Sequence, residues 1–222
     1  MDIALFTSHG LDYLMRWGHF LAGITWIGLL YYFNFVQGEY FKEAEASHRS
    51  GAIQKLVPRA LWWFRWAAMF TFITGVVMLA YRGMGTSYDI TIGATLGTLM
   101  FLNVWLIIWP NQKIVIASAT QVAEGGDALP EAAAAAPKAA LASRTNTLFS
   151  FPMLWFMGSS THMSNGLVID ASMAGLGAIL VVVAALEING IMGKQGPMTS
   201  VRGVIHCGLG LTVVLYGLMV AL

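Results

Sequence analysis

The sequence predicts an all-α fold, a polytopic transmembrane helix bundle of about six spans, since several stretches reach the roughly 20 residues that cross a bilayer. Composition is the first observation, because 57% of the residues are hydrophobic and 10% are charged. Soluble domains carry about 25% charged residues, so a compact chain with so few charges needs lipid over much of its surface. The long apolar stretches and the placement of the basic residues are the other two observations.

The predicted spans fill the chain as one domain, residues 1–222, with no internal repeat. The first apolar stretch follows Asp2 rather than a basic segment, so it is expected to remain as a membrane helix and not to act as a cleavable signal peptide. A very short turn at residues 164–166 is expected to join the fourth span to the fifth. The spans are expected at 14–38, 60–82, 89–112, 145–165, 168–188 and 203–222.

The connection formed by residues 113–144 is expected to be a cytoplasmic loop. From Glu124 onward it contains Pro130, Pro137 and a run of alanines, a low-complexity pattern typical of a mobile segment. Pro152 falls inside the fourth span, where it is expected to kink the helix and free a backbone carbonyl.

The lysines and arginines predict the orientation. The side that holds the termini carries only Arg16 and Arg82. Short cytoplasmic connections are enriched in basic residues, so the odd-numbered connections are expected inside and both termini in the periplasm. The protein is therefore expected to be a multi-pass protein of a bacterial inner (cytoplasmic) membrane. The basic residues of the odd-numbered connections are Lys42, Arg49, Lys55, Arg59, Lys113, Lys138, Arg144, Lys194 and Arg202.

Several functional classes are excluded by missing motifs. Cys207 is the only cysteine, which rules out an internal disulfide, a Cys-x-x-Cys-His haem attachment and a multi-cysteine zinc site. The sequence has no phosphate-binding loop, no nucleophile elbow and no His-Glu-x-x-His motif. The basic residues are scattered singly, without the blocks that would favour nucleic acid as a partner.

His19 and His162 are the strongest candidates for a functional site. Ionisable residues at membrane depth are costly and usually face the bundle interior. In the predicted topology both lie near the outer ends of their spans, the first and the fourth, so their imidazoles are expected at a similar depth. Two imidazoles at one level from different helices can take the two axial positions of a b-type haem, as the two protein ligands of its iron.

Other interpretations of these residues stay open. Both histidines could instead bond backbone carbonyls or interfacial water, or belong to a metal or substrate site. Arg16 and Arg82 are candidate partners for haem propionates, because guanidinium groups pair well with carboxylates. His206, in the sixth span, has no second histidine at its level, so a packed histidine and a ligand of a second haem together with a methionine are the two alternatives.

Three segments resemble a known family. They are residues 18–35 (GHFLAGITWIGLLYYFNF), residues 109–112 (WPNQ) and residues 143–153 (SRTNTLFSFPM), which lead to His162. Together they resemble the amino-terminal domain family of membrane-bound urate oxidase, also called urate hydroxylase. The resemblance implies oxidation of urate to 5-hydroxyisourate, with electrons passed to cytochrome c. In longer members of the family a c-type cytochrome domain follows, whereas these 222 residues contain no Cys-x-x-Cys-His motif.

Three functional hypotheses follow. The first is a membrane protein that holds b-type haem and exchanges electrons with a separate c-type cytochrome or a respiratory complex. The second is a urate hydroxylase that acts on urate with the same haem and with cytochrome c as acceptor. The third is a non-redox accessory subunit that packs against a respiratory complex. An oligomer is compatible with each of them.

Overall fold

The computed structural model describes residues 4–82, 86–163 and 173–222, and the regular structure in these ranges is entirely helical. The all-α prediction is therefore confirmed for this part of the chain. The long helices are α1 (Ser8–Tyr31), α4 (Val57–Arg82), α5 (Tyr88–Leu102), α6 (Trp109–Ala123), α7 (Ala132–His162), α8 (Met173–Met192) and α9 (Val201–Ala221). The shorter elements are η1 (Ala4–Phe6), η2 (Tyr32–Gln37), α2 (Gly38–Glu43), α3 (Ala46–Lys55), η3 (Asn103–Ile108) and η4 (Gly196–Thr199).

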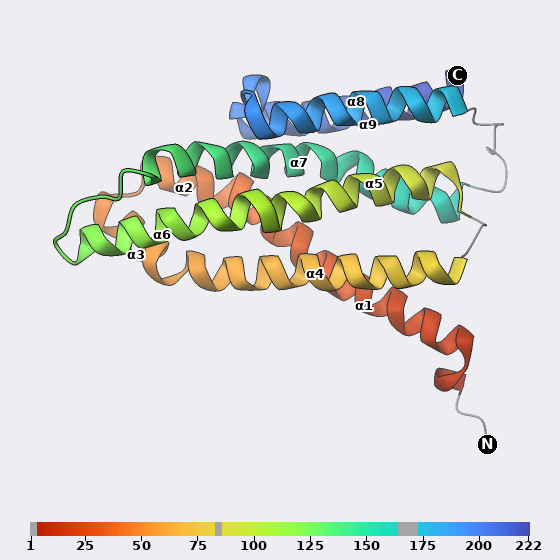
Figure 1. Cartoon of the computed structure of the whole chain (residues 1–222), viewed down its shortest axis with the longest axis horizontal. Coiled ribbons are helices and arrows are strands. Elements are labelled where there is room, and N and C mark those ends of the chain that lie inside the picture. Colours follow the sequence, from red (N-terminus) through yellow and green to blue (C-terminus); the bar gives the residue numbers. More distant parts are fainter. Residues whose placement is uncertain (1–3, 83–85, 164–172) are drawn as a thin grey trace.

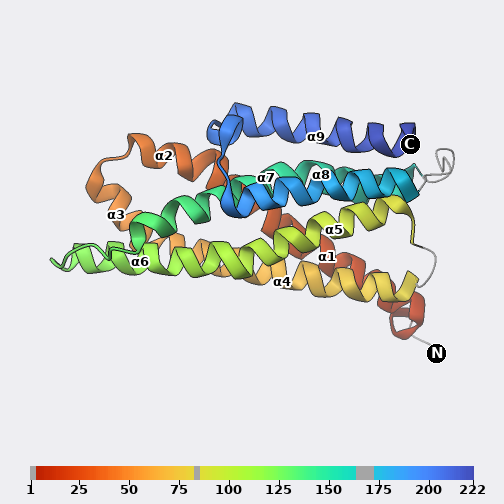
Figure 2. The ribbon, with the colours of Figure 1, turned by 45° about the horizontal axis from the view of Figure 1, so that its top comes forward.

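The helices α4 to α9 run along a common direction, whereas α1 crosses them obliquely, so the bundle has two ends (Figures 1 and 2). Figure 1 shows the start of α1 and the end of α9 at the same end, which we call the termini end. The helices α2 and α3 and the last turns of α6 lie at the opposite end, which we call the α3 end. Which end faces the periplasm stays a prediction.

Within the described ranges, five helical segments are long and apolar enough to cross a membrane. They are Ser8–Glu43, Val57–Arg82, Tyr88–Ala123, Met173–Met192 and Val201–Ala221. Their outward side chains are those that lipid solvates well: Ile24 on α1, Val181 on α8 and Val213 on α9 are each 70% exposed or more. Exposed apolar surface on this scale marks contact with a membrane or a partner. These helices define a membrane protein, while the number of crossings stays a prediction.

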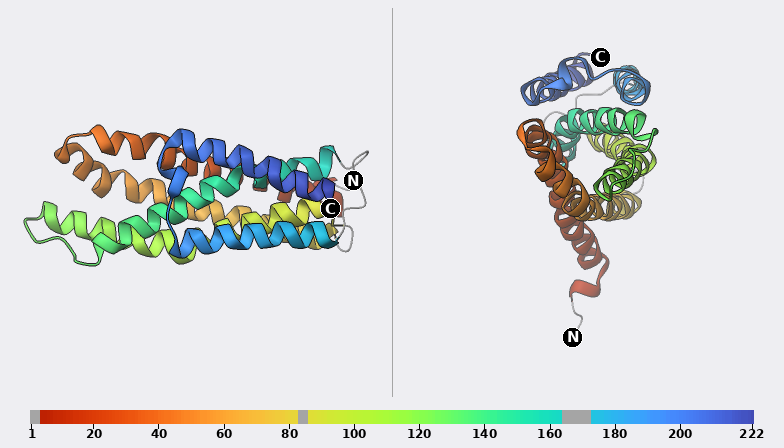
Figure 3. Two further views of the ribbon diagram at one scale, coloured as in Figure 1. Left: turned by 90° about the horizontal axis from the view of Figure 1, so that it is seen from above. Right: turned by 90° about the vertical axis from the view of Figure 1, so that its left-hand side faces the viewer.

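The helix α7 lies inside the bundle. This buried position explains why its sequence is less apolar than those of most of the other long helices. It packs against α5, α6, α8, α9 and η3 (Figure 3). Its arginine, threonines and serines are mostly buried against these neighbours, among them Arg144, Asn146, Thr147 and Ser150. A helix shielded from lipid by other helices can carry polar groups, provided that they find partners within the protein. The expected fourth span corresponds to the second half of this helix.

The expected loop at 113–144 is largely wrong, because most of these residues are helical. Residues 113–123 continue α6, and the alanine run begins α7 at Ala132. Alanine has the highest intrinsic helix propensity, and α7 continues past both of its internal prolines without a break in the helix assignment. The non-helical connection is therefore only 124–131. The turn expected at 164–166 lies outside the described residues.

Side-chain caps set the start of three helices. Thr7 Oγ1 accepts a hydrogen bond from the backbone N–H of Gly10 at 3.2 Å and begins α1. Ser87 caps α5 in the same way, and Ser200 caps α9 through the N–H of Gly203 at 3.0 Å. Threonine and serine are favoured at these positions because their hydroxyl satisfies an amide that the helix leaves unpaired.

Candidate functional site

His19 lies midway along α1, and its ring packs on α4. Nδ1 is 3.0 Å from Thr74 Oγ1, and this hydroxyl is 2.7 Å from the carbonyl oxygen of Phe70 and 3.0 Å from that of Thr71. A hydroxyl has one proton to donate, and a carbonyl can only accept. Thr74 therefore donates to its own helix, and His19 Nδ1 donates to Thr74. In the neutral imidazole the free lone pair then lies on Nε2.

Gly75 gives this ring its place on α4. A Cβ atom at this glycine would lie 3.3 Å from Cε1 of His19 and 3.7 Å from Nδ1, so the Nδ1 edge of the ring lies close to the α4 backbone. No side chain of the described residues forms a hydrogen bond with Nε2, and the backbone of Thr71 is the other hydrogen-bond partner of the ring. Histidines that bind metals have this arrangement, with one ring nitrogen fixed by an outer hydrogen bond and the other free for the metal.

The contacts between α1 and α7 place His19 and His162 at one level. Tyr31 Oη and Ser150 Oγ are 2.9 Å apart, and they join the two antiparallel helices. His19 precedes Tyr31 by 12 residues, and His162 follows Ser150 by 12 residues. At about 1.5 Å of rise per residue, both histidines lie about 18 Å from this contact toward the termini end.

The two helices diverge toward that end, however. Figures 1 and 3 show the first half of α1 running away from the bundle, on the side opposite to α7. His162 is exposed at the end of α7, whereas His19 is half-buried on α4. The structure describes no contact between these two residues. The predicted pair is thus brought to one level but not into contact, and its role as a ligand pair stays a prediction.

The two arginines predicted as propionate partners differ in their surroundings. Arg16 Nε donates to Asp12 Oδ2 at 2.7 Å, and Nη2 donates to Oδ1 at 3.3 Å. Arg16 lies one turn before His19 on α1. Asp12 accepts from Nε and Nη2 and so occupies the edge of the guanidinium that a propionate would use. Arg82 ends α4 and is half-buried. Sequence reasoning missed Asp12, although its spacing of four residues from Arg16 is the usual one for a helical ion pair.

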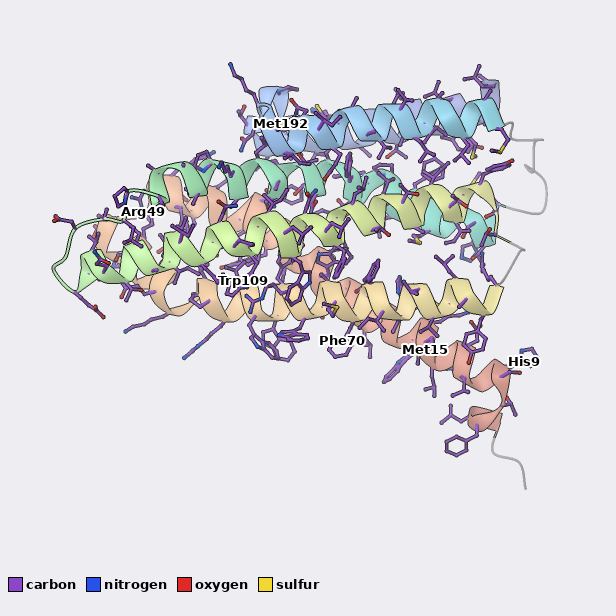
Figure 4. All side chains as sticks on the ribbon, viewed as in Figure 1. His9, Met15, Arg49, Phe70, Trp109 and Met192 are labelled. Carbon is purple, nitrogen blue, oxygen red and sulfur yellow. The ribbon has the colours of Figure 1, made fainter. Side chains whose placement is uncertain are left out.

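The remaining histidines are not gathered into a site. His206 is exposed on α9, and His48 is exposed on α3. His9 projects from the start of α1 away from the other helices (Figure 4). Within residues 4–82, 86–163 and 173–222, no group of three or more His, Cys, Asp or Glu side chains could hold a metal ion.

These observations fit one axial ligand of a haem. His19 offers a neutral imidazole with a free Nε2 and a fixed orientation, which is the donor that haem iron takes from a protein. The described contacts do not fix the second ligand. A groove of about 370 Å³ opens between α4 and α5, lined mainly by leucines and threonines. Thr91, Thr95 and Thr98 line it, and their hydroxyls donate to carbonyls of their own helix, so the groove offers shape rather than charge.

A second polar centre lies deeper in the bundle and was missed from the sequence. Asn103, 2% exposed, donates from Nδ2 to Asn146 Oδ1 at 2.9 Å and to Glu187 Oε2 at 3.1 Å. Asn146 is fully buried, and its own Nδ2 donates to the carbonyl of Met100 at 2.9 Å. This network joins η3, α7 and α8. Glu187, near the end of α8, thus accepts a hydrogen bond from a residue inside the protein.

The π-helical segments η2 and η3 each supply one buried asparagine. Asn34 of η2 donates from Nδ2 to Ser143 Oγ at 2.8 Å and to the carbonyl of Leu30 at 2.9 Å. Asn103 occupies the first position of η3. Single turns of π-helix are frequent at functional sites. An amide inside an otherwise charge-free apolar stretch is the sequence signal that could have pointed to both residues.

The fold and these sites define a class, a helical membrane protein with polar centres inside the bundle. Residues 84–192 match the sequence model of the urate oxidase N-terminal family. The resemblance noted in the sequence to this family is therefore confirmed over residues 84–192. The match includes His162, Arg144 and the network of Asn103, whereas His19 lies before it. No curated protein and no solved structure matches the chain.

Proposed function

We propose that this protein is a membrane-bound, urate-hydroxylase-like redox protein that holds b-type haem through His19 and His162 at the termini end. The observation that carries the proposal is the orientation of His19, whose Nδ1 donates to Thr74 while Nε2 keeps its lone pair. The shared level of His19 and His162 and the family of residues 84–192 support it. The termini end would then face the periplasm, as the distribution of basic residues predicts.

A b-type haem, when bound, supplies a one-electron redox centre whose potential depends on its ligands and its burial. The residues of this chain hold and orient it. Thr74 fixes the ring of His19, Gly75 lets that ring approach α4, and His162 is the second imidazole. Because both histidines lie toward one end of the bundle, a c-type cytochrome or a respiratory complex could approach the site from the water on that side.

Haem content and electron transfer test this proposal together. Protein purified in detergent is expected to contain haem that pyridine extraction identifies as b-type, and the reduced protein is expected to reduce added cytochrome c. His162→Ala is expected to lower the haem content, whereas His206→Ala, a change at an exposed histidine, is the matched control. Protein without haem, or equal haem in the two variants, would overturn the assignment of the ligands.

A second candidate function is urate oxidation by this chain itself, and the family match favours it. Membranes that contain the protein would then consume urate when cytochrome c is supplied as electron acceptor. Urate consumption is compared between two membrane preparations. Membranes with the His206→Ala protein are expected to be active, and membranes with the His19→Ala protein are expected to be inactive. Haem-containing membranes that reduce cytochrome c but leave urate unchanged would exclude the enzyme and retain the electron carrier.

A further inference from the structure

Five buried polar atoms of the described residues lack a hydrogen-bond partner. They are Trp26 Nε1, Gln37 Oε1, Arg65 Nη1, Trp105 Nε1 and Arg144 Nη1. Four of them are donors, one is an acceptor, and two belong to side chains that are always charged. Buried charges without a partner are strongly destabilising. The surplus of donors and of positive charge therefore matches a negatively charged ligand with several acceptor atoms.

Both arginines are buried without a neutralising ion pair among the described residues. Arg65 and Arg144 are each 8% exposed. The guanidinium carbon of Arg65 lies 3.3 Å from the centre of the Trp109 ring, and Figure 4 shows Trp109 on the side of α6 that faces α4. Stacking of this kind orients the planar guanidinium and leaves its edge free to donate. Within the described ranges, neither arginine forms a salt bridge.

Glu39 is the acidic group that acts electrostatically on Arg144, but it does not bind it. Its Oε1 lies 2.7 Å from Lys42 Nζ, in a surface ion pair. The carboxylate of Glu39 is therefore shared with a lysine and leaves Arg144 Nη1 without a partner. An anion from outside the chain would supply the missing hydrogen-bond acceptor for Arg144 Nη1 and neutralise its charge.

The helix contacts place four of these five groups, all except Trp26 Nε1, at one level, toward the α3 end. Three contacts join the segments that carry them: Phe33 with Phe64, Asn34 with Ser143, and Trp66 with Trp105. Arg65 lies between two of these contact residues along α4, and Arg144 follows Ser143 directly. Gln37 lies one turn beyond Asn34. Both π-helical segments contribute, η2 through Gln37 and η3 through Trp105.

We propose that this level of the bundle is a binding site for a small planar anion. Arg65 and Arg144 donate to its acceptor atoms, Trp105 Nε1 adds a neutral donor, and Gln37 Oε1 accepts from an N–H or O–H of the ligand. Guanidinium edges bind planar anions through paired hydrogen bonds, which a spherical or tetrahedral ion uses less fully. The site lies in the other half of the bundle from His19 and does not depend on haem.

Isothermal titration calorimetry of the purified full chain tests the site, with urate as the planar anion and inorganic phosphate as the tetrahedral one. The choice of urate rests on the second candidate function. Urate is expected to bind more tightly than phosphate. R65Q and R144Q are each expected to weaken urate binding by about 10- to 100-fold, since each removes a charged donor. R59Q, which changes an exposed arginine of the same helix, is expected to bind as the unchanged protein does.

W105F tests the site even if the arginine variants misfold, because it removes one neutral donor and keeps an aromatic ring. It is expected to weaken urate binding several-fold in a protein that elutes as the unchanged protein does. The proposal is overturned if urate does not bind, if phosphate binds equally well, or if R65Q and R144Q bind like R59Q. The haem absorbance of each sample is read separately, so failure of this site is distinguished from failure of the haem proposal.

Discussion

Thr74→Val isolates the hydrogen bond that orients His19. Valine has nearly the shape of threonine but lacks the hydroxyl, so the variant removes the acceptor that lies 3.0 Å from His19 Nδ1. The ring can then rotate or change its tautomer, and Nε2 no longer points consistently at a metal. Loss of such an outer partner typically costs about 10- to 100-fold in metal affinity, which corresponds to about 1.4 to 2.7 kcal/mol.

The assay is a spectral titration of haem into haem-depleted protein, from which the dissociation constant is obtained. Thr71→Val is the matched control. Its hydroxyl donates to the carbonyl of Ala67 at 2.8 Å, one turn back on the same helix, and makes no side-chain bond to His19. The control is expected to bind haem as the unchanged protein does. Equal affinities of the Thr74→Val and Thr71→Val proteins would refute the role assigned to Thr74.

Three further predictions concern the bundle itself, and thermal unfolding in detergent measures each. Asn146→Leu breaks two buried hydrogen bonds between helices and is expected to cost about 1 to 3 kcal/mol, whereas Thr147→Val, which loses one bond within its own helix, should cost less. Gly190→Ala places a Cβ 2.7 Å from Thr145 Oγ1 and is expected to cost about 1 to 3 kcal/mol; adding Thr145→Ala should restore most of the loss, and an unrelieved loss would contradict this contact. Ser200→Ala removes the cap of α9 and is expected to cost about 0.5 to 2 kcal/mol, so an unchanged midpoint would show that the cap does not contribute.

The apolar parts of the fold were predictable because lipid-facing helices must be apolar along their whole length. The charge-free stretches around Ile24 and Val213 are such helices, and both lie in segments that are long and apolar enough to span a membrane. The helix α7 could not be placed from hydropathy alone. Its neighbours shield it from lipid, so Arg144 was assigned to a loop and proves to be buried in the bundle. The alanine run was likewise taken for a loop, although its propensity favours a helix.

The candidate site was predictable only in part, for a related reason. Sequence spacing gives the depth of a residue along its helix, and the Tyr31–Ser150 contact agrees with a shared depth for His19 and His162. It does not give the direction in which a helix leans, so the divergence of α1 from α7 was not foreseen. The partner of His19 on α4, Thr74, is set by helix packing, which a single sequence does not reveal.

The most direct test of the central claim is the reduced-minus-oxidised absorption spectrum of the purified protein and of two histidine variants. The unchanged protein and the His206→Ala control are expected to show the α-band of a b-type haem with equal intensity per chain. His19→Ala is expected to lose or strongly shift that band, because it removes the imidazole that Thr74 holds in place. A spectrum without the band, or a band that His19→Ala leaves unchanged, would contradict the account.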